Sequence, residues 1–176
     1  MVTLTLVTGQ ATAGGWVLLC YWLPREPSTP RISVWRKLKR LGVAQLSDGM
    51  VALPADARTR EQLEWIADEI IHANGDASIW LAQPASVSQE RDLARRMAAA
   101  RAEEYAAITA EAQATDGTNR REQRRLADRL RAELRRIGRR DYFPPPERDI
   151  AHAAVSALLN DATADEPAGA GEEVLP

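Results

Sequence analysis

Residues 43–54 read "VAQLSDGMVALP", in which two short apolar runs flank Asp48 and Gly49. An Asp-Gly pair between two such runs is typical of a β-hairpin. It predicts a type I′ turn, because that turn needs positive φ at both central residues and this pair tolerates it. The stretch therefore predicts two antiparallel strands in the middle of the fold, and the segments on either side extend them.

A strand and a helix precede the hairpin, and another helix and strand follow it. Residues 16–23, "WVLLCYWL", are apolar at odd and even positions alike, which indicates a central strand with both faces covered. Residues 30–42 begin at a proline and end at a glycine, the usual pattern of a helix. Residues 59–75 predict a second helix, and residues 77–82 predict a fourth strand.

This β-α-β-β-α-β order predicts an α+β fold in which residues 16–84 form a ferredoxin-like βαββαβ domain. Both helices of that topology lie on one face of the sheet, so the other face needs a cover. Residues 85–159 predict a helical extension that supplies it. We expect a flexible leader at residues 1–15 and a disordered acidic tail at residues 160–176.

The helical extension consists of a helical hairpin and a short C-terminal helix. Residues 88–114 contain almost no turn formers, and residues 120–137 carry a narrow stripe of leucine and isoleucine, so both predict helices. The segment "RRDYFPPPERD" then breaks the chain with three prolines. Residues 150–159 predict the short apolar helix that follows.

The chain has five tryptophans, and the predicted elements assign each of them a place. Trp35, Trp65 and Trp80 fall on apolar stripes, so we expect them to pack in the core. Trp16 and Trp22 share one face of the first strand, and we expect them to lie under the helical extension.

Charge is unevenly distributed along the chain. The whole sequence has 23 Lys and Arg against 25 Asp and Glu, a net charge of −2, which excludes a uniformly basic nucleic-acid binder. Five of the acids and none of the bases lie in residues 160–176. Residues 119–140 instead hold ten arginines against three acids, a net charge of +7 over 22 residues. This local excess of arginine favours an anionic partner.

Few residues are suited to catalysis or to metal binding. One cysteine, Cys20, cannot form an intramolecular disulfide, and it suits the reducing cytoplasm. His72 and His152 lie in unrelated helices, and no glycine-rich phosphate loop opens a helix. The start of the chain lacks the basic region of a signal peptide, and the apolar run at residues 16–23 is too short to cross a bilayer. We expect a cytoplasmic protein that is not an enzyme and that has no metal, no cofactor and no contact with membranes.

Two groups of bases are the candidate DNA-binding residues. The first lies at the corner before the first helix and along its polar face, and comprises Arg25, Arg31, Arg36, Lys37, Lys39 and Arg40. The second lies on the arginine-rich helix, and comprises Arg120, Arg124, Arg131 and Arg135. Cations spaced along a helix can contact successive phosphates in a salt-sensitive interaction that is blind to sequence. A solvated helix face also explains the first group, and pairing with Glu103, Glu104 and Glu111 also explains the second.

Five short motifs occur in a recognisable order. They are a strand ending in "LP" at Pro24, the helix "VWRKLKRLG", a hairpin ending in "LP", the helix "EQLEWIADEI" and the segment "DYFPPPER". Together they resemble the N-terminal domain of ChrB, the chromate-resistance regulatory protein, over residues 16–159. The resemblance implies a ferredoxin-like module, similar to the central domain of PaaX-type repressors. It also implies a role in the transcriptional control of chromate-efflux operons.

This chain departs from the family at its C-terminal end. Full-length members carry a further domain, to which the response to chromate is usually attached, whereas here an acidic tail follows. The resemblance therefore implies a stand-alone N-terminal module. A separately encoded protein like the missing domain is an expected partner, and a homodimer is the expected assembly.

Three hypotheses about function remain open. The first is a DNA-associated regulatory module of the ChrB type. The second is a protein-interaction module that docks on a separate partner through its arginine-rich helical hairpin, without nucleic acid. The third is a metal-dependent nuclease on a ferredoxin-like dimer, which would need clustered carboxylates where the sequence has Pro24, Arg25 and Glu26.

Overall fold

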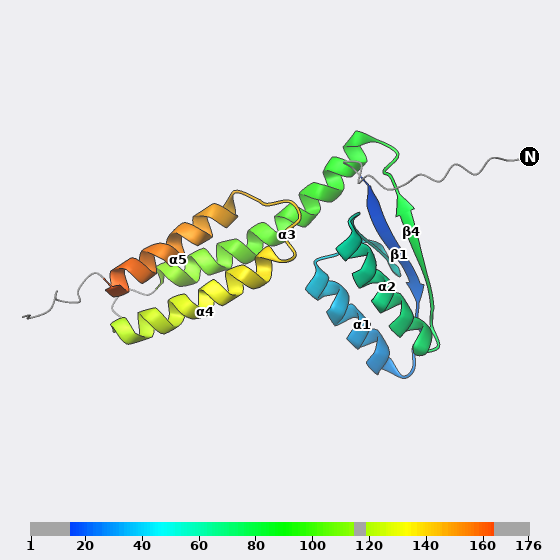
Figure 1. The fold of residues 1–176 in the computed structure, drawn as a ribbon, viewed down its shortest axis with the longest axis horizontal. Helices are drawn as coiled ribbons and strands as arrows, with labels where there is room; N and C mark the ends of the chain where they lie inside the picture. Colours follow the sequence, from blue (N-terminus) through cyan, green and yellow to red (C-terminus); the bar gives the residue numbers. More distant parts are fainter. Residues whose placement is uncertain (1–14, 115–118, 164–176) are drawn as a thin grey trace, which may run out of the picture. The chain divides into compact units, whose positions relative to one another are not determined.

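A computed structural model of the chain describes residues 15–114 and 119–163. Within them the fold is a mixed α+β arrangement with a four-stranded antiparallel sheet and five helices (Figure 1). The chain divides into two compact units between Met97 and Ala98. The elements are β1 (Trp16–Trp22), α1 (Ser28–Leu41), β2 (Ala44–Ser47), β3 (Met50–Pro54), α2 (Ala57–His72), β4 (Asp76–Ala82), α3 (Val87–Gln113), α4 (Arg120–Gly138) and α5 (Glu147–Thr163).

The sheet of the first unit has the strand order β2-β3-β1-β4, and every neighbouring pair is antiparallel. β1 therefore lies inside the sheet, as its apolar sequence predicts. Figure 1 shows α1 and α2 side by side on one face of the sheet. Val17 and Leu19 are completely buried, whereas Leu18 and Cys20, on the opposite face, are half-buried. The second face of β1 is therefore covered only in part, which is less than the sequence predicts.

The start of α3 meets one end of that second face. Trp16, Leu18 and Ala52 from the sheet line a hollow of about 310 Å³ together with Leu93 from α3. Trp16 is only 3% exposed, but Trp22, at the other end of β1, is 62% exposed. The expectation that both tryptophans are covered is therefore wrong for Trp22.

The β2–β3 hairpin forms at the predicted place with a different turn. Gly49 has a φ of 73°, but Asp48 does not take positive φ, so the turn is not type I′. The strand register shifts between Gln45 and Ser47, which leaves Leu46 as an extra residue in β2. Such a bulge increases the local twist, so the strands can be joined without positive φ at both turn residues.

Local hydrogen bonds explain where the first two helices begin and end. Gly42 adopts the left-handed conformation after α1, and its N–H bonds to the carbonyls of Leu38 and Lys39. Asp56 and Thr59 form a capping box before α2, so that helix begins earlier than predicted. The Thr59 hydroxyl also donates to the carbonyl of Pro54 at 2.6 Å, which ties the start of α2 to the end of β3.

Two of the predicted core tryptophans lie at the surface instead. Trp65 is 68% exposed because the buried positions of α2, such as Leu63 and Ile66, lie on the other side of the helix. Trp80 is 59% exposed because β4 is an edge strand and Trp80 lies opposite Leu18, on the face away from α1 and α2. Apolar periodicity alone does not show which face of an element finds a partner.

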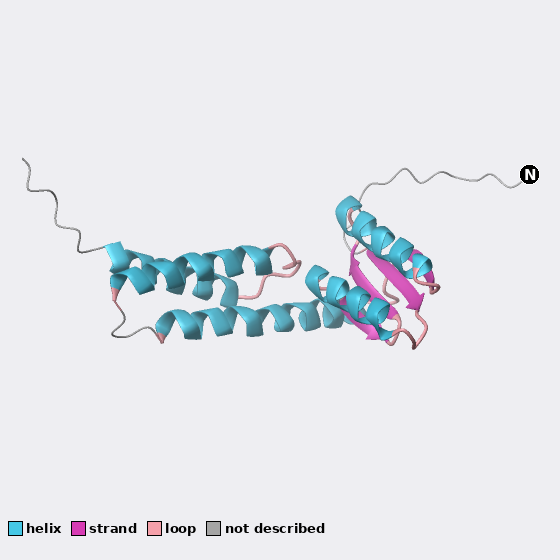
Figure 2. Cartoon of the chain, turned by 90° about the horizontal axis from the view of Figure 1, so that it is seen from below, coloured by secondary structure: helices cyan, strands magenta, loops and turns pink. Residues whose placement is uncertain are grey.

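The helical part of the second unit is a three-helix bundle and not only a hairpin. α5 is longer than predicted at both ends, and it packs with α3 and α4, as Figure 2 shows. The buried core of the bundle comprises Tyr105, Ile108, Ala112, Ala127, Leu130, Leu134, Ile137, Ala151, Val155 and Leu158. The leucine and isoleucine stripe of α4 therefore faces this core, as the sequence predicts.

The remaining predicted segments fall mainly outside the described residues. This applies to residues 1–14 of the predicted leader and to residues 164–176 of the predicted acidic tail. Every helix within residues 15–114 and 119–163 is too short or too polar to cross a lipid bilayer.

Candidate functional site

The four bases of α1 do not form one exposed group. Lys37 pairs with the carboxylate of Glu69 on α2, and that carboxylate also accepts a hydrogen bond from Ser33 at 3.2 Å. Lys39 lies over the ring of Trp35, with Nζ 5.3 Å from the ring centroid. Arg36 and Arg40 are exposed and form no ion pair within the described part of the chain. Lys37 therefore links two helices, although its side chain remains 44% exposed.

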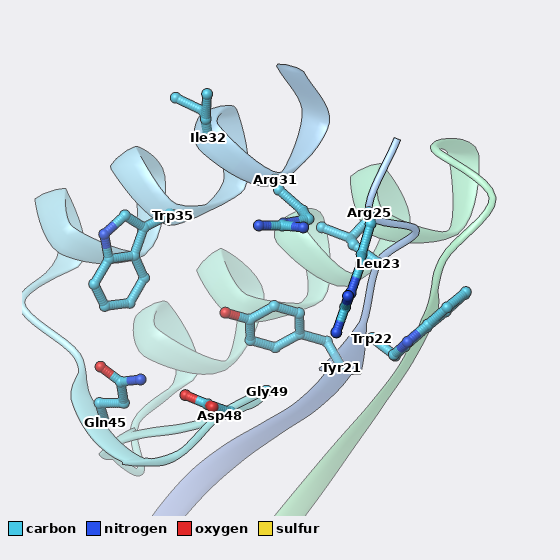
Figure 3. A pocket seen from close by; sticks show the side chains of 10 residues that line it. All are labelled: Tyr21, Trp22, Leu23, Arg25, Arg31, Ile32, Trp35, Gln45, Asp48 and Gly49. Atoms are coloured by element: carbon cyan, nitrogen blue, oxygen red, sulfur yellow. The ribbon is translucent and has the colours of Figure 1, made fainter. Parts of the chain in front are cut away.

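Arg25 and Arg31 belong to a separate feature, a cleft at the end of β1. We call it the Tyr21 cleft. It has a volume of about 580 Å³ and is lined by Tyr21, Trp22, Leu23, Arg25, Arg31, Ile32, Trp35, Gln45, Asp48 and Gly49. Figure 3 shows the guanidinium groups of Arg25 and Arg31 turned toward the ring of Tyr21. These two arginines therefore face a concave site and do not continue the outer face of α1.

Hydrogen bonding and close packing fix the position of Tyr21 in this cleft. Its backbone N–H donates to the carbonyl of Gly49 at 2.7 Å. A Cβ on Gly49 would lie 2.4 Å from the carbonyl oxygen of Tyr21, so only glycine fits this approach. Burial raises the pKa of the Tyr21 phenol, and the nearby carboxylate of Asp48 raises it further. Tyr21 therefore remains a hydrogen-bond donor at neutral pH.

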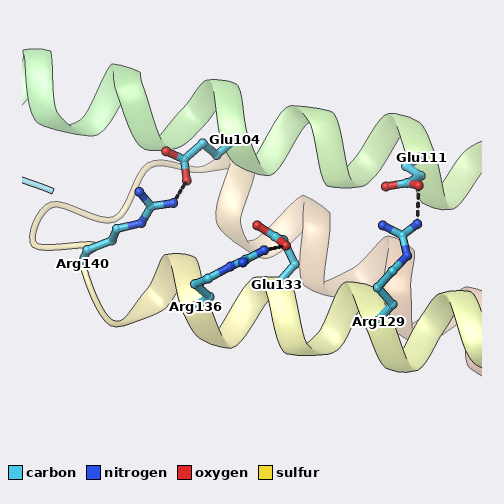
Figure 4. A network of polar contacts seen from close by, with 6 residues as sticks. All are labelled: Glu104, Glu111, Arg129, Glu133, Arg136 and Arg140. Atoms are coloured by element: carbon cyan, nitrogen blue, oxygen red, sulfur yellow. Dashed lines mark hydrogen bonds and ion pairs between the residues drawn. The ribbon is translucent and has the colours of Figure 1, made fainter. Parts of the chain in front are cut away.

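Some arginines of the second unit are held by acids, as Figure 4 shows. Arg129 pairs with Glu111 of α3, Arg136 pairs with Glu133, and Arg140 bonds to Glu104 at 2.5 Å. Glu104 and Glu111 of α3 thus pair with Arg140 and Arg129, which the sequence did not single out. No ion pair joins Arg124, Arg131 or Arg135 to a carboxylate within residues 15–114 and 119–163.

Arg131 and Arg135 instead line a second concavity with residues from α5. We call it the basic hollow. It has a volume of about 570 Å³ and is lined by Arg131, Leu134, Arg135, Gly138, Arg139, Arg148 and His152. Four of these seven residues are arginines and none is an acid, so the hollow is suited to an anion. Arg120 and Arg124, at the other end of α4, are exposed and do not line it.

Sequence reasoning missed three residues of the basic hollow, Arg139, Arg148 and His152. Arg148 and His152 are four residues apart, so they share one face of α5. That spacing was visible in the sequence, but the packing of α5 on α4 was not. Arg139 belongs to the arginine-rich segment, although the predicted helix ended before it.

A polar network holds the chain where α4 ends and the proline segment begins. The Tyr105 hydroxyl donates to Asp141 at 3.0 Å, and Arg101 pairs with Glu104 at 2.9 Å. Burial and the hydrogen bond to Asp141 raise the pKa of Tyr105 to about 12. Burial lowers the pKa of Arg101, while Glu104 acts in the opposite direction. These contacts are suited to stabilising the fold at this point of the chain.

The described residues provide no cluster of the kind that binds a metal. Among residues 15–114 and 119–163, no three histidine, cysteine, aspartate or glutamate side chains gather in such a group. His72 lies in the first unit, with Nδ1 2.6 Å from the carbonyl of Asp68, and His152 lies in the second.

Comparison with known proteins identifies the family. A family model described as "Protein ChrB, N-terminal" matches residues 31–165. Protein ChrB of Cupriavidus metallidurans strain CH34 is 31% identical over 140 residues, which cover 73% of this chain but only 40% of that relative. No solved structure matches. The family model spans most of the chain. The chain therefore belongs to the family of the N-terminal domain of protein ChrB.

Proposed function

We propose that this protein is a non-catalytic regulatory module associated with chromate resistance that binds DNA in the cytoplasm. Membership of the ChrB family supports the regulatory role. The observation that carries the binding of DNA is the basic hollow, in which arginines from α4 and α5 gather without an acid. A phosphate group in this hollow would meet guanidinium groups from two helices, which are well suited to bind phosphate oxygens.

The first unit supports the proposal in two ways. Its element order and its strand order β2-β3-β1-β4 are those we assign to the ferredoxin-like class. Arg36 and Arg40 are four residues apart, so they share a face of α1 and provide a second contact with the phosphate backbone. We propose that the protein acts as a homodimer, which would double the number of such contacts. A separately encoded partner would supply the response to an effector.

Binding can be tested by fluorescence anisotropy with a labelled duplex from upstream of the gene, at about 50 mM and about 200 mM salt. We expect binding that weakens strongly at the higher salt, because phosphate contacts release counterions. Arg131→Gln together with Arg135→Gln should weaken binding and lower the slope of log K against log salt by about two, close to 0.9 for each lost contact.

Arg129→Gln is the matched control, because it removes a charge from the same helix at a residue that pairs with Glu111 outside the basic hollow. It should leave the slope nearly unchanged. Absence of binding at low salt would contradict the proposal, and so would an equal loss in the control. Stoichiometric co-purification of an acidic protein, with no binding to DNA, would instead favour the protein-interaction hypothesis.

A further inference from the structure

The Tyr21 cleft is built by three separate stretches of the first unit. Tyr21 comes from the end of β1 and Arg25 from the corner that follows it, Trp35 comes from α1, and Asp48 comes from the hairpin turn. Its volume of about 580 Å³ falls within the range of small-molecule sites, roughly 300 to 1,000 Å³.

The charges in the cleft are not balanced by the protein. Arg25 and Arg31 both turn toward the ring of Tyr21, and neither forms an ion pair within residues 15–114 and 119–163 (Figure 3). Two like charges that converge in a concave site repel each other, and an anion bound between them would relieve that repulsion. Asp48 is the one acid that lines the cleft. The cleft therefore offers a single carboxylate for two guanidinium groups.

The walls beside these charges are flat and apolar. Trp35 is only half-buried, although the neighbouring Val34 is buried, so one part of its indole faces the cleft. The Tyr21 ring and Ile32 provide further apolar surface. Aromatic faces of this kind stack against planar groups. A tetrahedral inorganic oxyanion would satisfy the arginines, but it would leave these walls uncovered.

We propose that the Tyr21 cleft binds a small organic acid with a flat apolar body. Arg25 and Arg31 hold the carboxylate, while Trp35 and Tyr21 contact the body of the ligand. Gln45 and Asp48 accept hydrogen bonds from a polar substituent at the other end. The cleft belongs to the first unit and the basic hollow to the second, and the proposal does not depend on whether the protein binds DNA.

The proposal can be tested by isothermal titration calorimetry of the full chain with a set of simple probes. Benzoate and indole-3-acetate supply a carboxylate and a flat ring. Benzamide supplies the ring without the charge, and sulfate supplies the charge without the ring. We expect saturable binding of at least one of the two acids and none of benzamide. Arg31→Gln and Arg25→Gln should each weaken that binding by about tenfold or more, because each removes a charge-assisted hydrogen bond.

Arg36→Gln is the control, because it removes one charge from the same helix at a position that does not line the cleft. It should leave the affinity unchanged. Trp35→Ala should weaken binding of the acid, and circular dichroism should show that the fold persists. Four results would overturn the proposal: no binding of either acid at millimolar concentration, binding of benzamide as tight as that of benzoate, binding of sulfate alone, or an equal loss in Arg36→Gln.

Discussion

The hydroxyl of Tyr105 on α3 donates a hydrogen bond to the carboxylate of Asp141, 36 residues later, across 3.0 Å. Tyr105 is completely buried, and Asp141 begins the segment "DYFPPPER" that leads from the end of α4 into the first turn of α5. This bond therefore ties the middle of α3 to the point where the chain turns back toward the bundle. It gives a structural reason for the acid that opens this motif.

Tyr105→Phe should destabilise the bundle by about 1 to 3 kcal/mol, because it leaves the half-buried carboxylate of Asp141 without this donor. Urea unfolding followed by circular dichroism measures the change. In a double-mutant cycle with Asp141→Asn, the two single changes should add up to more than the combined change. If Tyr105→Phe and the wild type unfold at the same urea concentration, the hydrogen bond contributes nothing to stability.

The free energy of unfolding should decrease at high pH. The pKa of Tyr105 is raised to about 12 in the folded chain, from an ordinary value of 10.0, so the folded state favours the neutral phenol. Its contribution is therefore fully present below pH 10, and it is lost as the pH rises from about 10 to about 12. Unfolding measured across this window should show a loss of stability that is smaller in Tyr105→Phe. Identical pH profiles for the two proteins would contradict this assignment.

Gly49→Ala should be destabilising by about 1 to 3 kcal/mol, because its φ of 73° and the 2.4 Å approach to the Tyr21 carbonyl both exclude a Cβ. Gly138→Ala is the matched control, since a Cβ there would meet nothing within 4 Å. That change should be neutral or stabilising by up to about 1 kcal/mol, because alanine is the better helix former. Thermal unfolding of both variants measures the two changes in stability. Equal changes would show that the hairpin turn accommodates a Cβ at residue 49.

Lys37→Ala and Arg36→Ala should differ in their effect on DNA binding, although the two residues are adjacent. Lys37 is held by Glu69, whereas Arg36 is exposed. Arg36→Ala should reduce the salt slope of binding by about one, while Lys37→Ala should leave it nearly unchanged. Anisotropy titrations at several salt concentrations measure both. The reverse order would show that Lys37 leaves Glu69 when DNA is present.

Trp16→Ala and Trp65→Ala should have very different effects on stability. Trp16 is 3% exposed and Trp65 is 68% exposed. Removing the buried indole should cost about 3 to 5 kcal/mol, and removing the exposed one less than about 0.5 kcal/mol. Chemical denaturation distinguishes them directly. A large effect at Trp65 would mean that its exposed indole is covered in solution.

Much of the fold could be predicted from local signals. The Asp48-Gly49 pair marks the hairpin, and the unbroken apolar run of β1 marks a strand inside the sheet. The leucine stripe of α4 indicates which side of that helix is buried. These predictions succeeded because each depends on the periodicity or turn chemistry of a few neighbouring residues. The prediction failed at Trp65 and Trp80, whose surroundings depend on elements distant in the sequence.

The candidate sites also differ in what local sequence and what tertiary packing determine. The amino-acid sequence by itself determined that the chain has an excess of arginine in residues 119–140, and it determined the order of strands and helices. Only the tertiary structure decided which bases are held by acids, as Lys37 is by Glu69, and which line a concavity, as Arg31 and Arg135 do. The physical reason is that an ion pair or a cleft requires side chains from different segments to meet. Spacing along one helix shows which residues share a face, but packing decides what that face meets.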